Sequence, residues 1–123
     1  MSKTIETEED IILLVNSFYE KVRADKDLGY IFDGVAKVNW ETHLPKITEF
    51  WKGIAFGRSN FEGNPMQTHI LLNNKTPLKP ENFKRWLELF KNTLKEHFTG
   101  SKADELYERA ERIASLIQLK VSQ

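Results

Sequence analysis

The sequence contains no cysteine in its 123 residues. This absence excludes disulfide bonds, thiolate zinc sites, cysteine nucleophiles and cysteine-ligated iron–sulfur clusters, and it fits a reducing compartment. The sequence also lacks any apolar run near the roughly 18–20 residues that cross a bilayer. Its start, MSKTIETEED, is polar and acidic, unlike a secretory signal peptide. We therefore expect a cytoplasmic protein with no membrane partner.

Neither sign of charge is in excess. The 18 lysines and arginines balance 18 aspartates and glutamates, and no basic arm or patch stands out. A nucleic-acid partner is therefore not expected. The chain also lacks a Ser–His–Asp signature, a glycine-rich phosphate loop and a paired-carboxylate motif. Nothing in the sequence supports a hydrolase or a nucleotide enzyme.

Helical periodicity dominates what is present. The length fits one domain over residues 1–123, with a core large enough to be stable without disulfide bonds. We expect residues 1–10 to form a polar, loosely ordered N-terminus. Beyond them, apolar residues recur at about 100° per residue, and there is no strand-like alternation or internal repeat. The sequence predicts an all-α fold.

The first expected helix has clear signals at both ends. The stretch TEED at 7–10 predicts a capping box at its start, and DKDLG at 25–29 predicts its end. Residues 30–40 have one glycine and no clear period, which indicates short helical turns and loop. The apolar stripe of the first helix is formed by Ile11, Ile12, Val15, Phe18, Tyr19 and Val22.

Prolines set the expected bounds of the later helices. Because proline is tolerated in the first turn of a helix, Pro45 predicts that the second helix starts at about Thr42–Leu44. Residues 65–72 suit a single short helix between loops. Pro80 opens the longest expected helix, and SKAD at 101–104 caps the last one. The three apolar faces comprise His43, Ile47, Phe50 and Ile54, flanked by Trp51; then Phe83, Trp86, Leu87, Phe90 and Leu94; then Ala103, Leu106, Ala110, Ile113, Ile117 and Val121.

The three histidines are the candidate chemical groups. The spacing of His43 and His69 matches no zinc motif, and the Glu-x-x-His pairs of a di-iron bundle are not present in the required number. His97 falls near a helix C-terminus, where it complements the dipole, and we assign it no function. For His43 and His69, plain packing and a site both stay open. A haem iron needs only one proximal imidazole, beside an aromatic and aliphatic slot that Tyr19, His43 and Trp86 fit.

Five stretches carry a resemblance to a known family. They are FYEKVRADKDLGYIF (18–32), WETHLPKITEFWKGIAFG (40–57), FEGNPMQTHI (61–70), FKRWLELF (83–90) and ADELYERAERIASLI (103–117). In this order and spacing they resemble the third group of truncated haemoglobins, over nearly the whole chain after residue 10. The resemblance implies a two-over-two helical sandwich with a shortened first helix. It also implies haem b, with His69 as the proximal ligand of the iron.

The same resemblance assigns the distal side of the pocket. Tyr19 and Trp86 correspond to the distal tyrosine and tryptophan, and His43 to the distal-helix histidine, with Ile47 one turn further on. Phe32 corresponds to the aromatic residue that packs on the porphyrin near the inter-helix corner. Further expected lining residues, for which core packing is the alternative, are Phe50, Trp51, Ile54 and Met66. Candidates for the haem propionates by charge alone, for which a solvated surface is the alternative, are Lys46, Lys52, Arg58 and Lys75.

Three functions stay open from the sequence. The first is reversible binding of oxygen, nitric oxide, carbon monoxide or similar small ligands at the haem iron, beside the Tyr19 and Trp86 donors. If neither donor is lost to a competing bond, two such donors slow oxygen release by about two to four orders of magnitude. Slow release suits reaction of the bound gas better than delivery. The second function is therefore a haem enzyme with nitric oxide dioxygenase or peroxidase-like activity, served by a separate, unidentified reductase. The third is a cofactor-free helical interaction module. We favour a monomer in each case.

Overall fold

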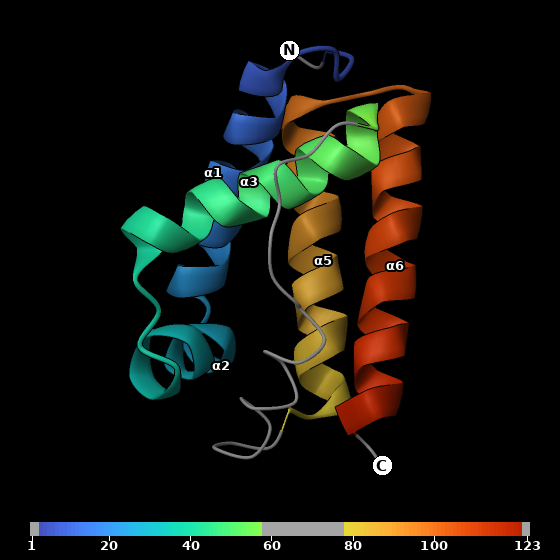
Figure 1. Cartoon of the computed structure of the whole chain (residues 1–123). Coiled ribbons are helices and arrows are strands. Elements are labelled where there is room, and N and C mark those ends of the chain that lie inside the picture. Colours follow the sequence, from blue (N-terminus) through green and yellow to red (C-terminus); the bar gives the residue numbers. More distant parts are fainter. Residues whose placement is uncertain (1–2, 58–77, 122–123) are drawn as a thin grey trace.

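The computed structural model describes residues 3–57 and 78–121 (Figure 1). Its elements are α1 (Glu8–Ala24), α2 (Lys26–Gly29), the π-helix η1 (Tyr30–Val35), α3 (Trp40–Phe56), α5 (Pro80–His97) and α6 (Ser101–Val121). Over these two ranges the secondary structure is helical, apart from one isolated bridge between Lys3 and Phe98. The predicted all-α class is confirmed.

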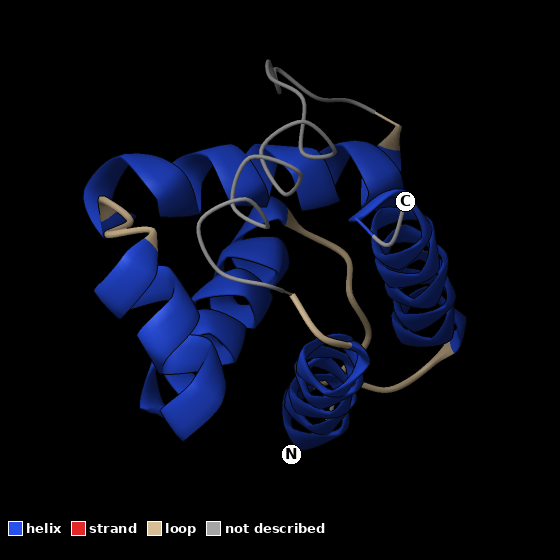
Figure 2. Cartoon of the chain, turned by 90° about the horizontal axis from the view of Figure 1, so that it is seen from below, coloured by secondary structure: helices blue, strands red, loops and turns tan. Residues whose placement is uncertain are grey.

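The four long helices form two layers of two. Helices α5 and α6 run antiparallel and side by side, while α1 packs against α5 and is crossed by α3 (Figures 1 and 2). The two-over-two sandwich expected from the resemblance is therefore confirmed. The core between the layers is made of large apolar side chains that exclude water almost completely. The largest of them are Ile11, Leu14, Val15, Phe18, Val22, Phe90 and Leu106.

The first turn of α1 is the capping box that the sequence predicts. The Thr7 hydroxyl accepts from the Asp10 amide at 3.3 Å, and the Asp10 carboxylate accepts from the Thr7 amide at 2.9 Å. The predicted apolar stripe is wrong at one position, because Ile12 is exposed and Leu14 is fully buried. Leu14 lies three residues after Ile11 and so shares its face of the helix, which Ile12 does not.

The corner after α1 is compact. The Asp25 carboxylate accepts from the amides of Asp27 and Leu28 at 3.1 and 3.0 Å, and so caps α2. A Cβ atom at Gly29 would lie 2.5 Å from the carbonyl oxygen of Arg23. Only glycine allows the two backbones this close approach.

Helix α3 starts earlier than the sequence predicts. It begins at Trp40, where the Asn39 side chain accepts from the amide of Glu41 at 3.1 Å. The later start predicted from Pro45 is wrong, because this proline sits inside the helix, in its second turn. Pro45 has no N–H, so it leaves the carbonyl of Glu41 without its usual helical partner. The helical turns expected within residues 30–40 are confirmed as η1.

The C-terminus of α3 is closed from two sides. Gly57 adopts a left-handed conformation with φ 72° and returns its amide to the carbonyl of Gly53. The ammonium group of Lys102, on α6, donates to the carbonyl of Ala55 at 2.8 Å. A cation at this end of a helix complements the helix dipole. The contact also ties the two layers together.

Helices α5 and α6 follow the predicted pattern closely. Pro80 lies in the first turn of α5, and Gly100, with φ 98°, precedes α6. Helix α6 has 21 residues and α5 has 18, so the prediction that the Pro80 helix is the longest is wrong. On α5, Phe90 and Leu94 are buried. The half-buried residues of the predicted α5 face are Phe83, Trp86 and Leu87, and on α6 Ala103, Leu106, Ala110 and Ile117 are buried.

The described part of the N-terminal segment for which the sequence predicts loose order, residues 3–10, is held at the turn between α5 and α6. The Lys3 amide donates to the carbonyl of His97 at 3.2 Å, and the Thr99 amide donates to the Lys3 carbonyl at 2.9 Å. Ile5 is buried behind these bonds. The Lys3 ammonium group also forms an ion pair with the buried carboxylate of Asp10.

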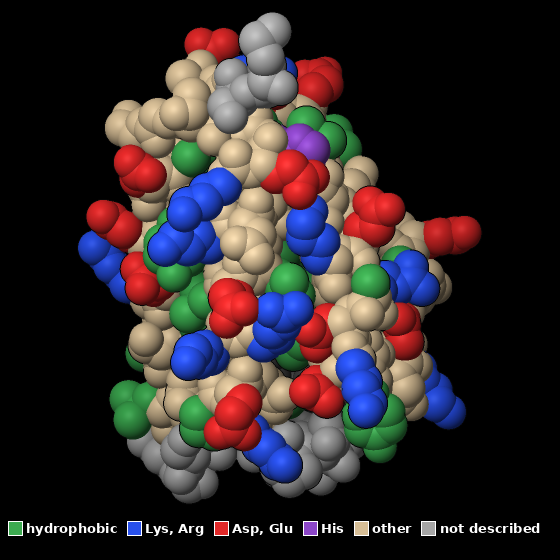
Figure 3. Space-filling model, turned by 180° about the vertical axis from the view of Figure 1, so that it is seen from behind, with side chains coloured by type: hydrophobic (Ala, Val, Ile, Leu, Met, Phe, Trp, Pro, Cys, Tyr) green, Lys and Arg blue, Asp and Glu red, His purple; other side chains and the backbone are tan. Residues whose placement is uncertain are grey.

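Charged side chains of both signs are mixed on one face of the molecule. On the face opposite the view of Figure 1, lysine and arginine side chains alternate with aspartate and glutamate side chains (Figure 3). This mixture agrees with the formal net charge of zero. None of the described helices combines the length and apolarity that a membrane span requires.

Candidate functional site

Four aromatic rings from three elements meet beside the C-terminal half of α1. They are Tyr19 of α1, Phe32 of η1, and Trp40 and His43 of α3, and we call them the Tyr19 cluster. The Tyr19 ring centroid lies 5.5 Å from that of Trp40, 6.1 Å from Phe32 and 6.3 Å from His43. Trp40 lies 5.5 Å from His43 and 6.0 Å from Phe32. The structure thus brings two of the predicted site residues, Phe32 and His43, into contact with a third, Tyr19.

Tyr19 is a buried hydrogen-bonding group in this cluster. Its side chain is 6% exposed, and burial raises the pKa of its phenol to about 12. A hydrogen bond from Trp86 opposes this shift in part. Since an indole N–H only donates, the direction of this bond is fixed, from Trp86 to the Tyr19 oxygen. The phenol therefore stays protonated at neutral pH and keeps its own O–H for another acceptor.

Trp86 is held in a column of aromatic rings. Its ring stacks on Phe90 at 5.8 Å with an interplanar angle of 1°, and it meets the edge of Phe18 at 5.2 Å. Phe90 stacks in turn on Trp51 at 4.9 Å. Trp51, expected to line the pocket, is only 2% exposed and belongs to this column in the core. Its contact with a cofactor stays a prediction.

Half-buried apolar side chains continue from the Tyr19 cluster along α3 and α5. Ile47, Phe50 and Ile54 follow His43 on one helical face and pack against the core without being fully covered. Leu87 and Trp86 do the same on α5. Large apolar side chains left partly open beside a few hydrogen-bond donors are typical of a site for a flat apolar ligand.

The expected iron ligand cannot be judged from the described residues. His69 and Met66 lie outside them, as do Arg58 and Lys75. In the part of the chain that the structure describes, no group of three or more His, Cys, Asp or Glu side chains gathers around a position for a bare metal ion. The Tyr19 cluster fits a porphyrin by its aromatic lining and by its donor set. Neither of these features depends on His69.

Of the cations expected near haem propionates, two can be located. Lys46 is exposed on α3. The ammonium group of Lys52 contacts the carboxylates of Glu8 at 3.2 Å and Glu49 at 3.0 Å. These ion pairs account for Lys52 as a link between α1 and α3. A role for either lysine with a propionate stays a prediction.

Trp40 is the site residue that the sequence reasoning missed. It lies three residues before His43, so both side chains share one face if the helix already includes position 40. Because Pro45 predicts a helix start after Trp40, the sequence places Trp40 in the stretch of short helical turns and loop before that helix. The available signal was Asn39, a strong N-cap residue directly before it.

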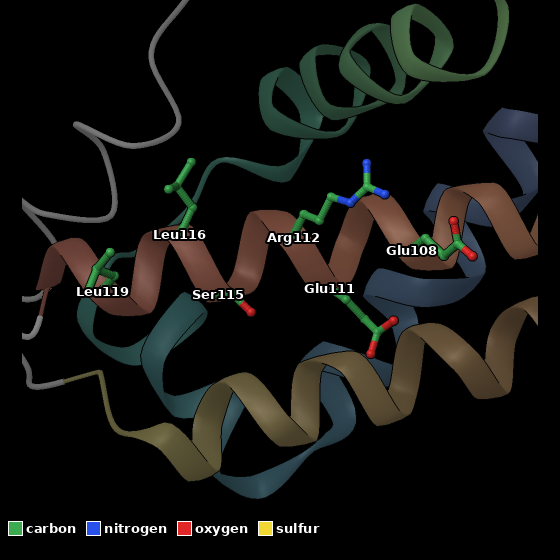
Figure 4. Close-up of a pocket in the computed structure, with 6 residues that line it drawn as sticks. All are labelled: Glu108, Glu111, Arg112, Ser115, Leu116 and Leu119. Carbon is green, nitrogen blue, oxygen red and sulfur yellow. The ribbon is translucent and has the colours of Figure 1, made fainter.

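A depression on α6 lies apart from this site. Its lining side chains all belong to α6 (Figure 4): Glu108, Glu111, Arg112, Ser115, Leu116 and Leu119. None of them belongs to the Tyr19 cluster or to the aromatic column. The depression therefore adds nothing to the candidate site.

Comparisons with known proteins agree with this geometry. The sequence matches the family described as Bacterial-like globin over residues 3–119. It is 38% identical over 114 residues to a protein of Campylobacter jejuni described as "Group 3 truncated hemoglobin ctb", covering 90% of this chain and 87% of that relative. The fold is similar to the crystal structure of a group III truncated hemoglobin from Campylobacter jejuni, with a TM-score of 0.86 and 34% identity. That match covers 98% of this chain and 95% of the other.

A two-over-two helical sandwich with an aromatic cluster beside its first long helix is the arrangement expected of a truncated globin. The chain belongs to the bacterial-like globin family, as the match over residues 3–119 shows. Its predicted resemblance to the third group of truncated haemoglobins is confirmed by the sequence and structural relatives. Membership of a globin family supports haem binding by this chain.

Proposed function

We propose that the chain binds haem b through His69 and uses the Tyr19 cluster to bind oxygen and other small diatomic gases. Haem would supply an iron atom with one position open to such a gas. The observation that carries the proposal is the buried Tyr19 hydroxyl, hydrogen-bonded by Trp86 among half-buried aromatic side chains. Family membership supports the haem, and the donors support a polar ligand.

In this proposal the two donors have different tasks. Trp86 donates to the Tyr19 oxygen, which leaves the Tyr19 O–H as the group directed to a gas molecule. A phenol that already accepts a hydrogen bond donates more strongly, because chains of hydrogen bonds polarise one another. Tyr19 is thus the primary donor and Trp86 supports it. His43, in edge contact with the Tyr19 ring at 6.3 Å, covers the approach from α3.

The spectrum of the purified protein tests the haem proposal. With adequate haem supply, we expect Soret absorbance in the ferric, ferrous and carbon monoxide-treated forms. His69→Gly should lose tightly held five-coordinate haem, because His69 is the proposed proximal ligand. His97→Gln is the matched control, since His97 lies at the far end of α5 beside Glu96, and it should keep the wild-type spectrum.

Absence of a Soret band in the wild-type protein would favour the cofactor-free helical module instead. A His69→Gly variant with the wild-type spectrum would leave the haem in place and refute the ligand assignment. The two results separate the question of the cofactor from the question of its ligand.

A second candidate is an enzyme that consumes the bound gas. Tyr19 as primary donor, supported by Trp86, favours slow release of oxygen, which suits nitric oxide dioxygenation or peroxidase-like chemistry better than delivery. A separate reductase would supply the electrons. Repeated turnover of nitric oxide with oxygen and a reductant would establish this activity. A single stoichiometric reaction without turnover would leave ligand binding as the function.

A further inference from the structure

Three side chains contact one another pairwise: Arg23 of α1, Asp33 of η1 and Trp40 of α3. The Trp40 indole N–H donates to Oδ1 of Asp33 at 2.6 Å, and Arg23 Nε donates to Oδ2 of the same carboxylate at 3.2 Å. The Arg23 guanidinium also covers the Trp40 ring, 5.0 Å from its centroid. We call Arg23, Asp33 and Trp40 the indole clamp.

The clamp grips a strained part of the backbone. Asp33 lies in the π-helix η1, an uncommon conformation that often marks functional sites. Between η1 and α3, Lys37 adopts a left-handed conformation with φ 52°, which non-glycine residues rarely do. Such a conformation persists where surrounding contacts enforce it. The indole clamp joins the chain on both sides of this residue.

The Trp40 ring also contacts two residues of the proposed ligand site. It lies 5.5 Å from Tyr19 and 5.5 Å from His43, centroid to centroid. Each clamp contact is exposed and modest by itself. Together they approach the indole at its edge and at its face, so they restrict both its tilt and its rotation. A fixed indole in turn restricts the two rings that it touches.

We propose that the indole clamp makes Trp40 a positioning residue, which holds Tyr19 in its donating geometry and His43 over the entry to the pocket. The proposal rests on the proposed function, because it concerns a gas ligand beside Tyr19. It adds a specific prediction. Loosening the clamp alters ligand kinetics through Tyr19, because Arg23 and Asp33 hold Trp40, which is itself in contact with Tyr19.

Two variants loosen the clamp in different ways. Trp40→Phe keeps a ring but removes the N–H, and Asp33→Ala removes the acceptor for both Trp40 and Arg23. Oxygen dissociation by stopped flow and carbon monoxide association by flash photolysis give the two rates of interest. We expect both variants to raise each rate about fivefold or more, equivalent to about 1 kcal/mol. Asp33→Asn, which keeps an oxygen and the side-chain shape, should give a smaller change.

A double-mutant cycle separates positioning from a merely structural role. In a Tyr19→Phe background the same clamp variants should change oxygen dissociation by less than about twofold, because the group that they position is gone. Glu96→Gln is the matched control. It breaks the exposed ion pair of Glu96 with Lys21, 3.2 Å long, between α1 and α5, and it should leave both rates unchanged.

A second readout does not depend on ligand kinetics. In the proton NMR spectrum of the carbon monoxide-treated protein, the indole N–H signal of Trp40 is identified by its loss in Trp40→Phe. We expect this proton to exchange with water more slowly in the wild type than in Asp33→Ala, because the carboxylate holds it. Equal exchange rates would contradict the clamp itself.

The outcomes distinguish this proposal from the proposed function. A wild-type chain without a Soret band overturns both. A normal Soret band with unchanged rates in the clamp variants overturns the positioning role alone. Equal rate changes in the Tyr19 and Tyr19→Phe backgrounds also overturn it, because the effect would then bypass Tyr19.

Discussion

The first turn of α1 buries an ionised carboxylate, Asp10, whereas the second half of the same helix buries a neutral phenol, Tyr19. The Asp10 oxygens meet the amides of Glu6 and Thr7, both at 2.9 Å, and the ammonium group of Lys3. Tyr19 receives one hydrogen bond, from Trp86, and has half-buried rings around it. The first end is fully occupied by the protein's own groups, and the second keeps a donor for another molecule.

The two ends show how one helix separates stability from function. A buried charge is tolerated only when it is paired and hydrogen-bonded, so the contacts of Asp10 contribute to stability. A buried neutral hydroxyl requires less compensation, so Tyr19 can hold its proton for a ligand. Substitutions at the two ends should therefore change different measurements.

The largest expected effect is at the functional end. Tyr19→Phe removes the primary donor and should speed oxygen dissociation by about one to two orders of magnitude, since a hydrogen bond to a charged acceptor contributes roughly 1.5–3 kcal/mol. Stopped-flow displacement of oxygen by carbon monoxide measures this rate. In the Tyr19→Phe protein, Trp86→Phe should speed oxygen dissociation by a smaller factor than it does in the wild type, because Trp86 acts through Tyr19. Strictly additive effects would show that the two donors act independently.

At the other end of α1, Asp10→Asn should lower stability and leave ligand kinetics unchanged. The amides and Lys3 lower the pKa of the Asp10 carboxyl from about 3.8 to about 2, although burial opposes them. This difference corresponds to about 2 kcal/mol of stability. Because the folded pKa is the lower one, this stability is present above pH 3.8 and is lost as the pH falls toward 2.

Chemical denaturation of the wild type and Asp10→Asn at several pH values measures this contribution. The difference between the two proteins should be full at pH 6 and shrink steadily below pH 4. A constant difference over this range would mean that the charge of Asp10 is not what stabilises the fold.

The sequence predicts the helical parts around Asp10 and Tyr19 but not the contacts that join these parts to distant segments. The capping box at Thr7 follows from local residue types, so it could be read directly. The contact of Lys3 with Asp10 and the α5–α6 turn joins distant segments, which no periodicity reveals. Trp40 was missed because proline is expected in the first turn of a helix, so Pro45 predicted a helix that starts after Trp40. In the structure, Asn39 as N-cap prevails over that rule.

The candidate site shows the same division. Helical spacing places Tyr19, His43 and Trp86 on apolar faces and leaves a shared haem slot as one option, and the family resemblance assigns each of them its place in that slot. The spacing did not show that Trp86 donates to Tyr19 and thereby assigns each a different task. Nor did it distinguish Trp51, deep in the core, from Phe50 beside it, which is half-buried. Those distinctions depend on how the two layers cross.

A smaller effect is expected where the layers are joined. Lys102→Met keeps most of the apolar stem and removes the ammonium group that donates to the carbonyl of Ala55. The end of α3 would lose a charged cap, at a cost of about 1 kcal/mol. The thermal midpoint of unfolding should fall by a few degrees. Lys102→Arg is the control that keeps a cation there and should recover most of the loss.

The smallest effect is expected from Lys52, which joins the first turn of α1 to α3. Its partner Glu8 lies at the surface and Glu49 is half-buried, so solvent and salt still reach and screen these ion pairs. Lys52→Met should lower the thermal midpoint by about 2 °C or less, and the difference should vanish in 1 M salt. Haem retention at low salt is the sharper measurement, because Lys52 is also a candidate partner for a propionate. Unchanged haem retention would mean that Lys52 only links α1 to α3. A clear loss of haem would instead support a contact of Lys52 with a propionate.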